Sequence, residues 1–323
     1  DALGKSGETF VSVSDFDIEL DPSQLPNSNT NFACSEPNVT RDDRIGSVFN
    51  EIFSVIHMTE NNCIWSFRGI DFLHPFFIAA LSIFKDNCKH NIACKDMSYQ
   101  IQRYFDVIHF EHLYDASDLI NKEALKDYFK KSYIPISRFL IKNKDIDKIQ
   151  EVLQGVIQEQ PNISRNMCTP ISHLLGELVG NISEHSCSEY GYLYCQHFQK
   201  ELYIVIADAG KTIYNSYIDT NKYVDLIGTD EAKALKIANE GYSTKDRPEA
   251  ENRGYGISKS REMVVDGLKG RFFMLSGTAF YRYADNNINA VNIPEDFRWN
   301  GTIILLRIPT EAPSGFEFYN YVE

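Results

Sequence analysis

The sequence carries a carboxylate and a carboxamide four residues apart, at Glu177 and Asn181. Apolar residues recur around them at steps of three and four: Leu174, Leu175, Leu178 and Ile182. This spacing predicts an amphipathic helix over residues 171–186, on which side chains four apart lie one above the other. A carboxylate and a carboxamide placed in this way suit a hydrated magnesium ion and an attacking water. The same spacing also arises by chance on many helices.

A second candidate site residue, Asp208, follows an apolar run over residues 202–207 that is typical of a buried strand. A carboxylate at the end of such a strand is fixed and partly desolvated, so it can accept a hydrogen bond from an exocyclic amine. Gly210 would let the backbone approach a flat ring closely. An ordinary turn after the strand is the alternative interpretation of Asp-x-Gly.

Glycines next to a helix start form a third feature. Gly254-Tyr-Gly256 runs directly into a helix predicted over residues 257–266. Free N–H groups and the positive end of the helix dipole would meet there and favour phosphate. The stretch is neither a Walker loop nor a Rossmann fingerprint, and a plain helix N-terminus is the alternative. Thr302 stands at the beginning of a last buried strand.

Regular elements in both halves of the chain must position these residues. In the second half, helices are predicted over 145–158, 171–186, 231–239 and 257–266, and strands over 133–141, 191–198, 202–207, 271–275, 279–283 and 301–309. In the first half, helices are predicted over 45–58, 72–84 and 97–107, and short strands over 63–67 and 92–94. Strands that alternate with helices indicate an α/β (α+β) protein. The predicted domains are an extension over 1–40, an α/β domain over 41–130, a second domain over 131–312 and a tail over 313–323.

The chemical features of the second half follow one another in a fixed order: Glu177-x-x-x-Asn181, Asp208-x-Gly210, a glycine-rich stretch before Gly254-x-Gly256, and a strand beginning Gly301-Thr302. This ordered set resembles the GHKL ATPase superfamily, which includes the gyrase B subunit, sensor histidine kinases and anti-sigma-factor serine kinases. The resemblance covers about residues 133–310. The stretch Glu-Leu-Val-Gly-Asn-Ile-Ser-Glu-His and the run Ser243-Thr-Lys245 look most like the serine-kinase branch. The fold implied is a two-layer α/β sandwich with a mixed sheet covered by helices on one face.

The resemblance also implies a role for each matched position. Asn181 would hold Mg²⁺ against the phosphates of ATP, and Glu177 would polarise the attacking water or hydroxyl. Asp208 would accept a hydrogen bond from the adenine amino group, with Thr302 assisting through a water, and Gly210 would lie beneath the base. The phosphate and lid positions would be Lys245, Asn252, Arg253, Gly254 and Gly256.

The order of elements over residues 41–130 resembles the STAS fold of anti-sigma-factor antagonists. In that family a strand leads through a turn bearing a phospho-acceptor serine into a helix. Here the turn reads Phe72-Leu-His-Pro-Phe-Phe-Ile78, and the serine position falls near Pro75, which has no hydroxyl. The resemblance therefore implies a STAS-like domain without that phosphorylation switch. An unrelated α/β module is the alternative.

Composition restricts the possible partners. The net charge of −13 argues against binding to nucleic acid through a broad basic field. No apolar run approaches the ~20 residues of a membrane span, and the first residues lack the pattern of an export signal. Seven cysteines without CxxC pairs indicate reduced thiols, so a cytoplasmic location is expected. The spacing of His185, Cys187, Cys195 and His197 leaves a zinc site as an alternative to ordinary packing.

The sequence therefore predicts an ATP-binding protein with ATP and Mg²⁺ as cofactors. It would hydrolyse ATP or transfer phosphate to a protein serine or threonine in a bacterial-type regulatory system. Two alternatives stay open. One is an ATP-controlled switch without catalysis, and the other is an interaction module whose amino-terminal domain binds a protein partner or a second copy. A sensor histidine kinase is disfavoured because His173 lies inside the nucleotide helix and no separate phospho-acceptor segment is found.

Overall fold

The chain divides into two compact units, residues 1–113 and residues 114–323. The computed structural model describes residues 11–12, 56, 59, 63–68, 70, 73–89, 91–117, 124–128, 131–141, 151, 154–155, 159, 163–244 and 256–322. Both units combine strands with helices, so the predicted mixed α/β class is confirmed. The predicted helix over 45–58 and most of the one over 145–158 lie outside the described residues.

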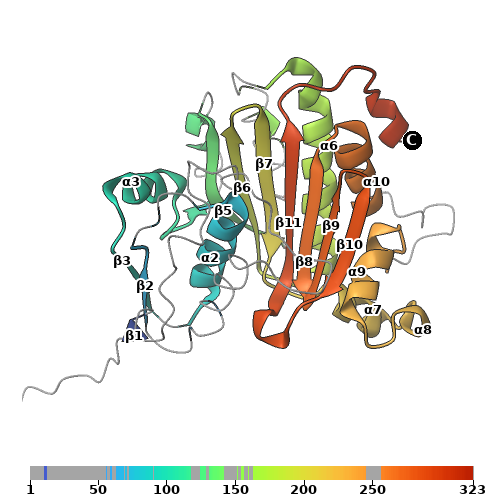
Figure 1. The fold of residues 1–323 in the computed structure, drawn as a ribbon, viewed down its shortest axis with the longest axis horizontal. Helices are drawn as coiled ribbons and strands as arrows, with labels where there is room; N and C mark the ends of the chain where they lie inside the picture. Colours follow the sequence, from blue (N-terminus) through green and yellow to red (C-terminus); the bar gives the residue numbers. More distant parts are fainter. Residues whose placement is uncertain are drawn as a thin grey trace, which may run out of the picture. The chain divides into compact units, whose positions relative to one another are not determined.

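The described residues of the first unit form a small parallel sheet and the helices α2 and α3 (Figure 1). Its elements are β1 (Val11–Ser12), β2 (Cys63–Ser66), α2 (Pro75–Asn87), β3 (Ile92–Lys95) and α3 (Tyr99–Ile108). The strands pair in the order β1-β2-β3. Pro75 fits the first turn of α2, as predicted, because that position needs no N–H bond within the helix. The His74 Nδ1 atom caps this helix by accepting the Phe76 N–H at 3.2 Å.

An eight-stranded sheet forms the framework of the second unit (Figure 1). Its strands are β4 (Tyr114–Asp115), β5 (Tyr133–Leu140), β6 (Tyr190–Phe198), β7 (Glu201–Asp208), β8 (Arg271–Gly277), β9 (Ala279–Ala284), β10 (Asn287–Asn292) and β11 (Trp299–Pro309). The order is β10-β9-β8-β11-β7-β6-β5-β4. All neighbours are antiparallel except β4 and β5, so the sheet is mixed. β4 lies in the range predicted for the amino-terminal domain, but it pairs with β5.

The described helices of the second unit pack on this sheet or on one another. They are η3 (Leu125–Tyr128), α6 (Arg165–His185), α7 (Ile213–Thr220), α8 (Val224–Ile227), α9 (Glu231–Asn239), α10 (Ile257–Glu262), the π-helical turn η4 (Met263–Gly267), η5 (Glu295–Phe297) and η6 (Phe318–Tyr321). One core cluster joins side chains of α6, α9 and η4 to one face of the sheet. The predicted helix over 171–186 is confirmed as the larger part of α6, and the one over 257–266 as α10 followed by η4.

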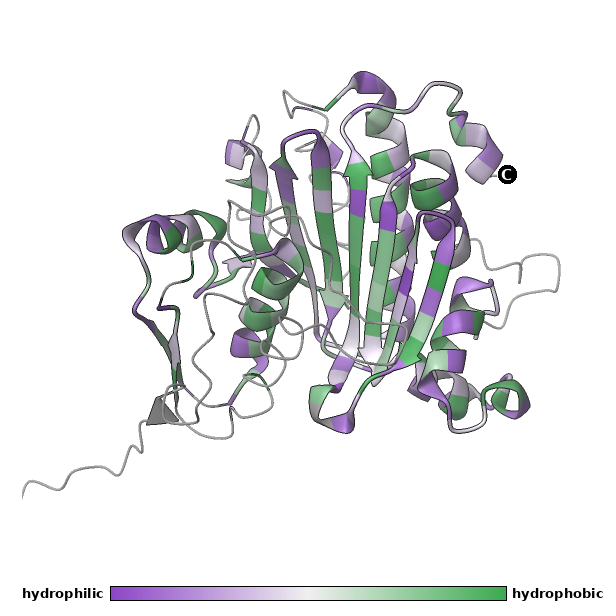
Figure 2. Cartoon of the chain, viewed as in Figure 1, coloured by the Kyte–Doolittle hydropathy of each residue, from purple (hydrophilic) through white to green (hydrophobic). Residues whose placement is uncertain are grey.

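The central strand β7 is buried on both faces. Its side chains alternate between the core cluster beneath α6 and the opposite face, and no residue from 202 to 207 is more than 3% exposed. Figure 2 shows hydrophobic residues along the central strands of the sheet. A side chain at the end of such a strand is therefore held rigidly and largely away from water. No helix in the described part of the chain is long and apolar enough to span a membrane.

Candidate functional site

A cavity of about 220 Å³ in the second unit is lined by residues of α6, α7, α9, α10, β7 and β11. α6 contributes Glu177 and Asn181, β7 ends in it with Asp208, β11 contributes Thr302, and Gly256 lies just before α10. Apolar side chains also line the cavity: Leu178, Ile182, Ile213, Ile257 and Ile304. The cavity is smaller than the roughly 300–1,000 Å³ of most ligand pockets, so it suits one flat ring system better than a whole extended ligand.

Asp208 is the most buried carboxyl group of the cavity, at 2% exposure. Burial raises the pKa of its carboxyl group from the ordinary 3.8 to about 7, against the opposing effect of hydrogen bonds from the Gly210 and Thr302 N–H groups. The Gly210 bond is 2.9 Å long and ends on Oδ1. The Trp299 indole N–H donates to the Asp208 carbonyl at 3.2 Å and fixes the backbone as well. The carboxyl group thus changes charge near neutral pH in a fixed position.

Thr302 lies opposite Asp208 in the pairing of β7 with β11. Its hydroxyl is 3.1 Å from the hydroxyl of Ser276 on the neighbouring strand β8. The Ser276 hydroxyl also accepts the Ile213 N–H at 3.0 Å and donates to the Gly301 carbonyl at 2.9 Å. Ser276 therefore connects the cavity strand to the first turn of α7.

Asn181 presents an unsatisfied polar atom to the cavity. Its Nδ2 is buried and has no hydrogen-bond partner among the residues that the structure describes. A Cβ atom at Gly256 would come 2.7 Å from Nδ2 and 2.9 Å from Oδ1, so a larger residue at the start of α10 would displace this amide. A buried amide without a partner is costly, so Asn181 is a candidate for contact with a ligand. Glu177 lies one turn away, half-buried in the same wall.

Gly210 lies against the backbone of α6's C-terminal end and does not line the cavity. A Cβ atom at this position would overlap the Ser186 carbonyl oxygen. Glycine is needed here because the loop after β7 passes so close to that backbone. The place of Gly210 beneath a base stays a prediction.

Several residues that line the cavity are not among those that the sequence predicts for an ATP site. They are His185, Lys211, Tyr217, Tyr242 and Thr244. Lys211 Nζ pairs with Asp219 at 2.6 Å, and His185 Nδ1 is 3.4 Å from the Thr244 hydroxyl. The Tyr217 hydroxyl donates to the Tyr242 carbonyl, which ties α7 to the chain after α9. Local signals are that Lys211 directly follows Gly210 and that Thr244 lies in the run Ser243-Thr-Lys245.

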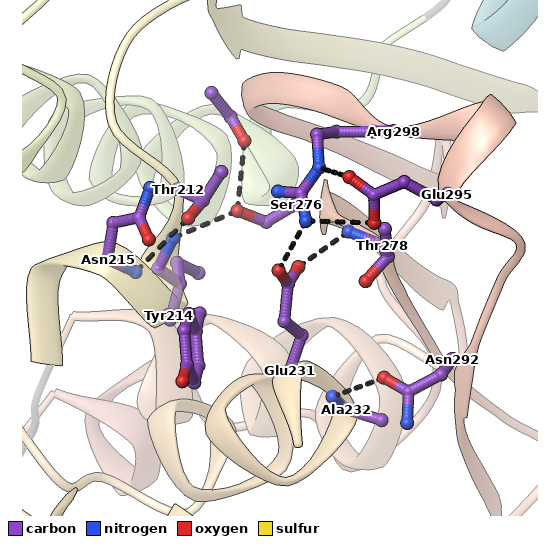
Figure 3. Close-up of polar contacts among 12 residues, drawn as sticks. Thr212, Tyr214, Asn215, Glu231, Ala232, Ser276, Thr278, Asn292, Glu295 and Arg298 are labelled. Carbon is purple, nitrogen blue, oxygen red and sulfur yellow. Dashed lines mark hydrogen bonds and ion pairs between the residues drawn. The ribbon is translucent and has the colours of Figure 1, made fainter. Parts of the chain in front are cut away.

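A separate polar cluster holds α9 on the sheet (Figure 3). The Glu231 carboxylate accepts the Thr278 N–H at 2.6 Å and pairs with Arg298 Nη2 at 2.8 Å. Arg298 also binds Glu295. Gly277 sits so close to Glu231 that a Cβ would overlap its Oε2 atom. The end of β8 is thus fixed at Thr278 by Glu231 and at Ser276 by the hydrogen bonds of its hydroxyl group.

Four predicted positions, Lys245, Asn252, Arg253 and Gly254, lie outside the described residues. The residues of the alternative zinc site are all described, and they do not gather. Within the described ranges, no three His, Cys, Asp or Glu side chains come together as metal ligands. Cys195 instead belongs to the core cluster, at 2% exposure, and burial raises the pKa of its thiol. Ordinary packing accounts for it.

Comparison with protein-family models and with curated proteins found no match to this chain.

Proposed function

We propose that the second unit binds ATP with Mg²⁺ in the cavity between α6, β7, β11 and α10, as a domain of the GHKL type. The observation that carries the proposal is the convergence of Glu177, Asn181, Asp208 and Thr302 on one cavity. These residues come from three elements and span more than a third of the chain. A cavity that combines apolar side chains with convergent polar groups and a carboxyl group of strongly shifted pKa is typical of a ligand site.

The adenine ring would occupy the end of the cavity at Asp208. Above its pKa of about 7 the buried carboxylate only accepts hydrogen bonds, and an exocyclic amine supplies the donor that it needs. The apolar side chains of Ile213 and Ile304 offer surfaces for a flat ring. The modest cavity volume is consistent with this base end, with the phosphates extending beyond it.

Asn181 would face the phosphates and the magnesium ion. Its carboxamide offers an oxygen ligand, which Mg²⁺ prefers, and an N–H donor for a phosphate oxygen. Mg²⁺ bound with a nucleotide keeps waters and phosphate ligands and needs only one or two protein groups. A single amide therefore fits the ion, although the described residues hold no cluster of protein ligands.

Glu177 would act on the reacting water or hydroxyl, one turn of α6 from Asn181. Its carboxylate would orient that group and take its proton, which makes the domain an ATPase or a serine/threonine-type protein kinase. A positioned base contributes about 10²- to 10⁴-fold to such a reaction. Binding of ATP without turnover would instead favour the non-catalytic switch.

We also propose that the first unit is a STAS-like module that binds a protein partner or a second copy. The alternation β2-α2-β3-α3 with parallel strands supports this assignment. Pro75 begins α2 at the place of the family's acceptor serine, so regulation would not pass through a phosphate there. Light scattering with and without ATP tests the module. A molecular mass equal to that of the monomer in both states would count against self-association.

Calorimetric titration with ATP, in the presence and absence of Mg²⁺, tests the two ends of the site separately. Asp208→Asn should weaken binding under both conditions, because it alters the base end. Asn181→Ala should weaken binding mainly when Mg²⁺ is present. Asp285→Asn removes a carboxylate from an exposed turn and serves as the matched control. If neither cavity variant weakens binding, the site is assigned wrongly.

A further inference from the structure

Ser276 lies behind the cavity wall. Its side chain contacts Thr302 and does not reach the cavity. It is 3% exposed and is not among the residues that line the cavity. Its hydroxyl oxygen is within hydrogen-bond distance of three groups: the Ile213 N–H, the Gly301 carbonyl and the Thr302 hydroxyl. The directions of these three bonds follow from the chemistry of the partners.

A hydroxyl group has one proton to donate and two lone pairs to accept with. The Ile213 N–H can only donate, so it uses one lone pair of Ser276. The Gly301 carbonyl can only accept, so it takes the single Ser276 proton. The remaining lone pair of Ser276 must then accept the proton of Thr302, at 3.1 Å. This assignment satisfies all four groups. If Ser276 instead donated its proton to Thr302, the Gly301 carbonyl would lose its donor.

We propose that Ser276 is a positioning residue that sets the nucleobase specificity of the cavity, by holding the Thr302 hydroxyl so that it presents only lone pairs. This inference rests on the proposed ATP site and adds a residue that determines which base it takes. With its proton directed at Ser276, Thr302 can only accept from the ligand or from a bridging water.

Two acceptors then stand side by side at the polar end, Thr302 and the Asp208 carboxylate, which are opposite each other in the strand pairing. A purine with an amino group at position 6 supplies the donor that this pair requires. A purine with a carbonyl there places a third acceptor against the other two and leaves them unpaired. A water that donates one proton to Thr302 has its second proton free for ring nitrogen N1, which accepts in adenine but carries a proton in hypoxanthine.

Removal of the Ser276 hydroxyl frees the Thr302 proton to turn toward the ligand. Ser276→Ala should therefore lower the ratio of the affinity for ATP to that for inosine triphosphate by about 2- to 10-fold, the range of one neutral hydrogen bond. Inosine triphosphate differs from ATP in the group at position 6 and, with it, in the proton on N1. Damage to the start of α7, where Ile213 loses its acceptor, would weaken both nucleotides together and leave the ratio unchanged.

The test is calorimetric titration of both nucleotides with Mg²⁺ at pH 8 into wild type, Ser276→Ala, Thr302→Val and the double variant. The ratio should fall in both single variants, and Ser276→Ala should have no further effect in the Thr302→Val background. Ser276→Cys, which nearly keeps the side-chain volume, should act in the same direction and replaces Ser276→Ala if that variant does not fold.

Two results would overturn the inference while the ATP site stands: an unchanged ratio in Ser276→Ala, or an equal fall with and without the Thr302 hydroxyl. If the wild type binds neither nucleotide, the proposed ATP site fails and the role of Ser276 fails with it.

Discussion

The free energy of unfolding of Asp208→Asn, relative to that of wild type, should increase as the pH rises. Burial raises the pKa of the Asp208 carboxyl to about 7 in the folded chain, whereas an unfolded chain keeps the ordinary value near 4. Between these values the folded state binds more protons than the unfolded state. The stability that protonation contributes is present at low pH and is lost as the pH rises through this window.

The size of the effect follows from the pKa shift. Each pH unit within the window removes about 1.4 kcal/mol from the free energy of unfolding. Between pH 5 and pH 8 the wild type should therefore lose about 3 kcal/mol that Asp208→Asn retains, because the variant has no carboxyl group at this site. For a unit of this size that is roughly 6–12 °C in Tm.

Tryptophan fluorescence during urea unfolding can measure this difference in the second unit alone. The chain has two tryptophans, Trp65 in the first unit and Trp299 in the second. Trp299 donates to the Asp208 carbonyl, so in a Trp65→Phe background the signal comes from beside the site. Asp285→Asn serves as the control for loss of an exposed charge. If Asp208→Asn changes the free energy of unfolding of the Trp65→Phe background equally at pH 5 and pH 8, the Asp208 carboxyl does not titrate near neutrality. That result would refute the prediction.

Two further substitutions probe the loop and the reaction. Gly210→Ala should destabilise the fold by about 2 kcal/mol, because its Cβ would overlap the Ser186 carbonyl oxygen. Gly180→Ala, with open space around its Cβ on α6, should instead stabilise the fold by about 1 kcal/mol in the same urea assay. If both substitutions change the free energy of unfolding equally, the close approach of Gly210 to the Ser186 carbonyl does not control stability. Glu177→Gln should reduce ATP turnover about 10²- to 10⁴-fold with ATP affinity retained, measured by phosphate release. Unchanged turnover would remove Glu177 from the reaction.

Local patterns predicted the elements that carry the candidate site. The three- and four-residue spacing around Glu177 and Asn181 is confirmed as α6, with both side chains in the cavity wall. The apolar run before Asp208 is confirmed as the buried strand β7. Such predictions succeed because a side chain's face on a helix or strand depends on its neighbours in sequence. The GHKL and STAS resemblances stay predictions.

Contacts that depend on strand order could not be predicted in the same way. β11 lies between β7 and β8, which brings Ser276 beside Thr302 across 26 positions of sequence. Nothing near Ser276 in the sequence distinguishes it from other buried serines. Tyr217 and Tyr242 likewise meet only because α7 and the chain after α9 pack together. The place of Gly210 against the α6 backbone depends on the same tertiary packing.

The most direct test of the central claim is the affinity of the chain for Mg-ATP at pH 8, measured by calorimetry for wild type and Asp208→Asn. The proposed site predicts saturable binding to wild type and a loss of about 10- to 100-fold in the variant, as expected for one hydrogen bond to a charged group. Asp285→Asn should bind as wild type does. Equal affinities for wild type and Asp208→Asn, or no binding by wild type, would contradict the assignment of this cavity to ATP.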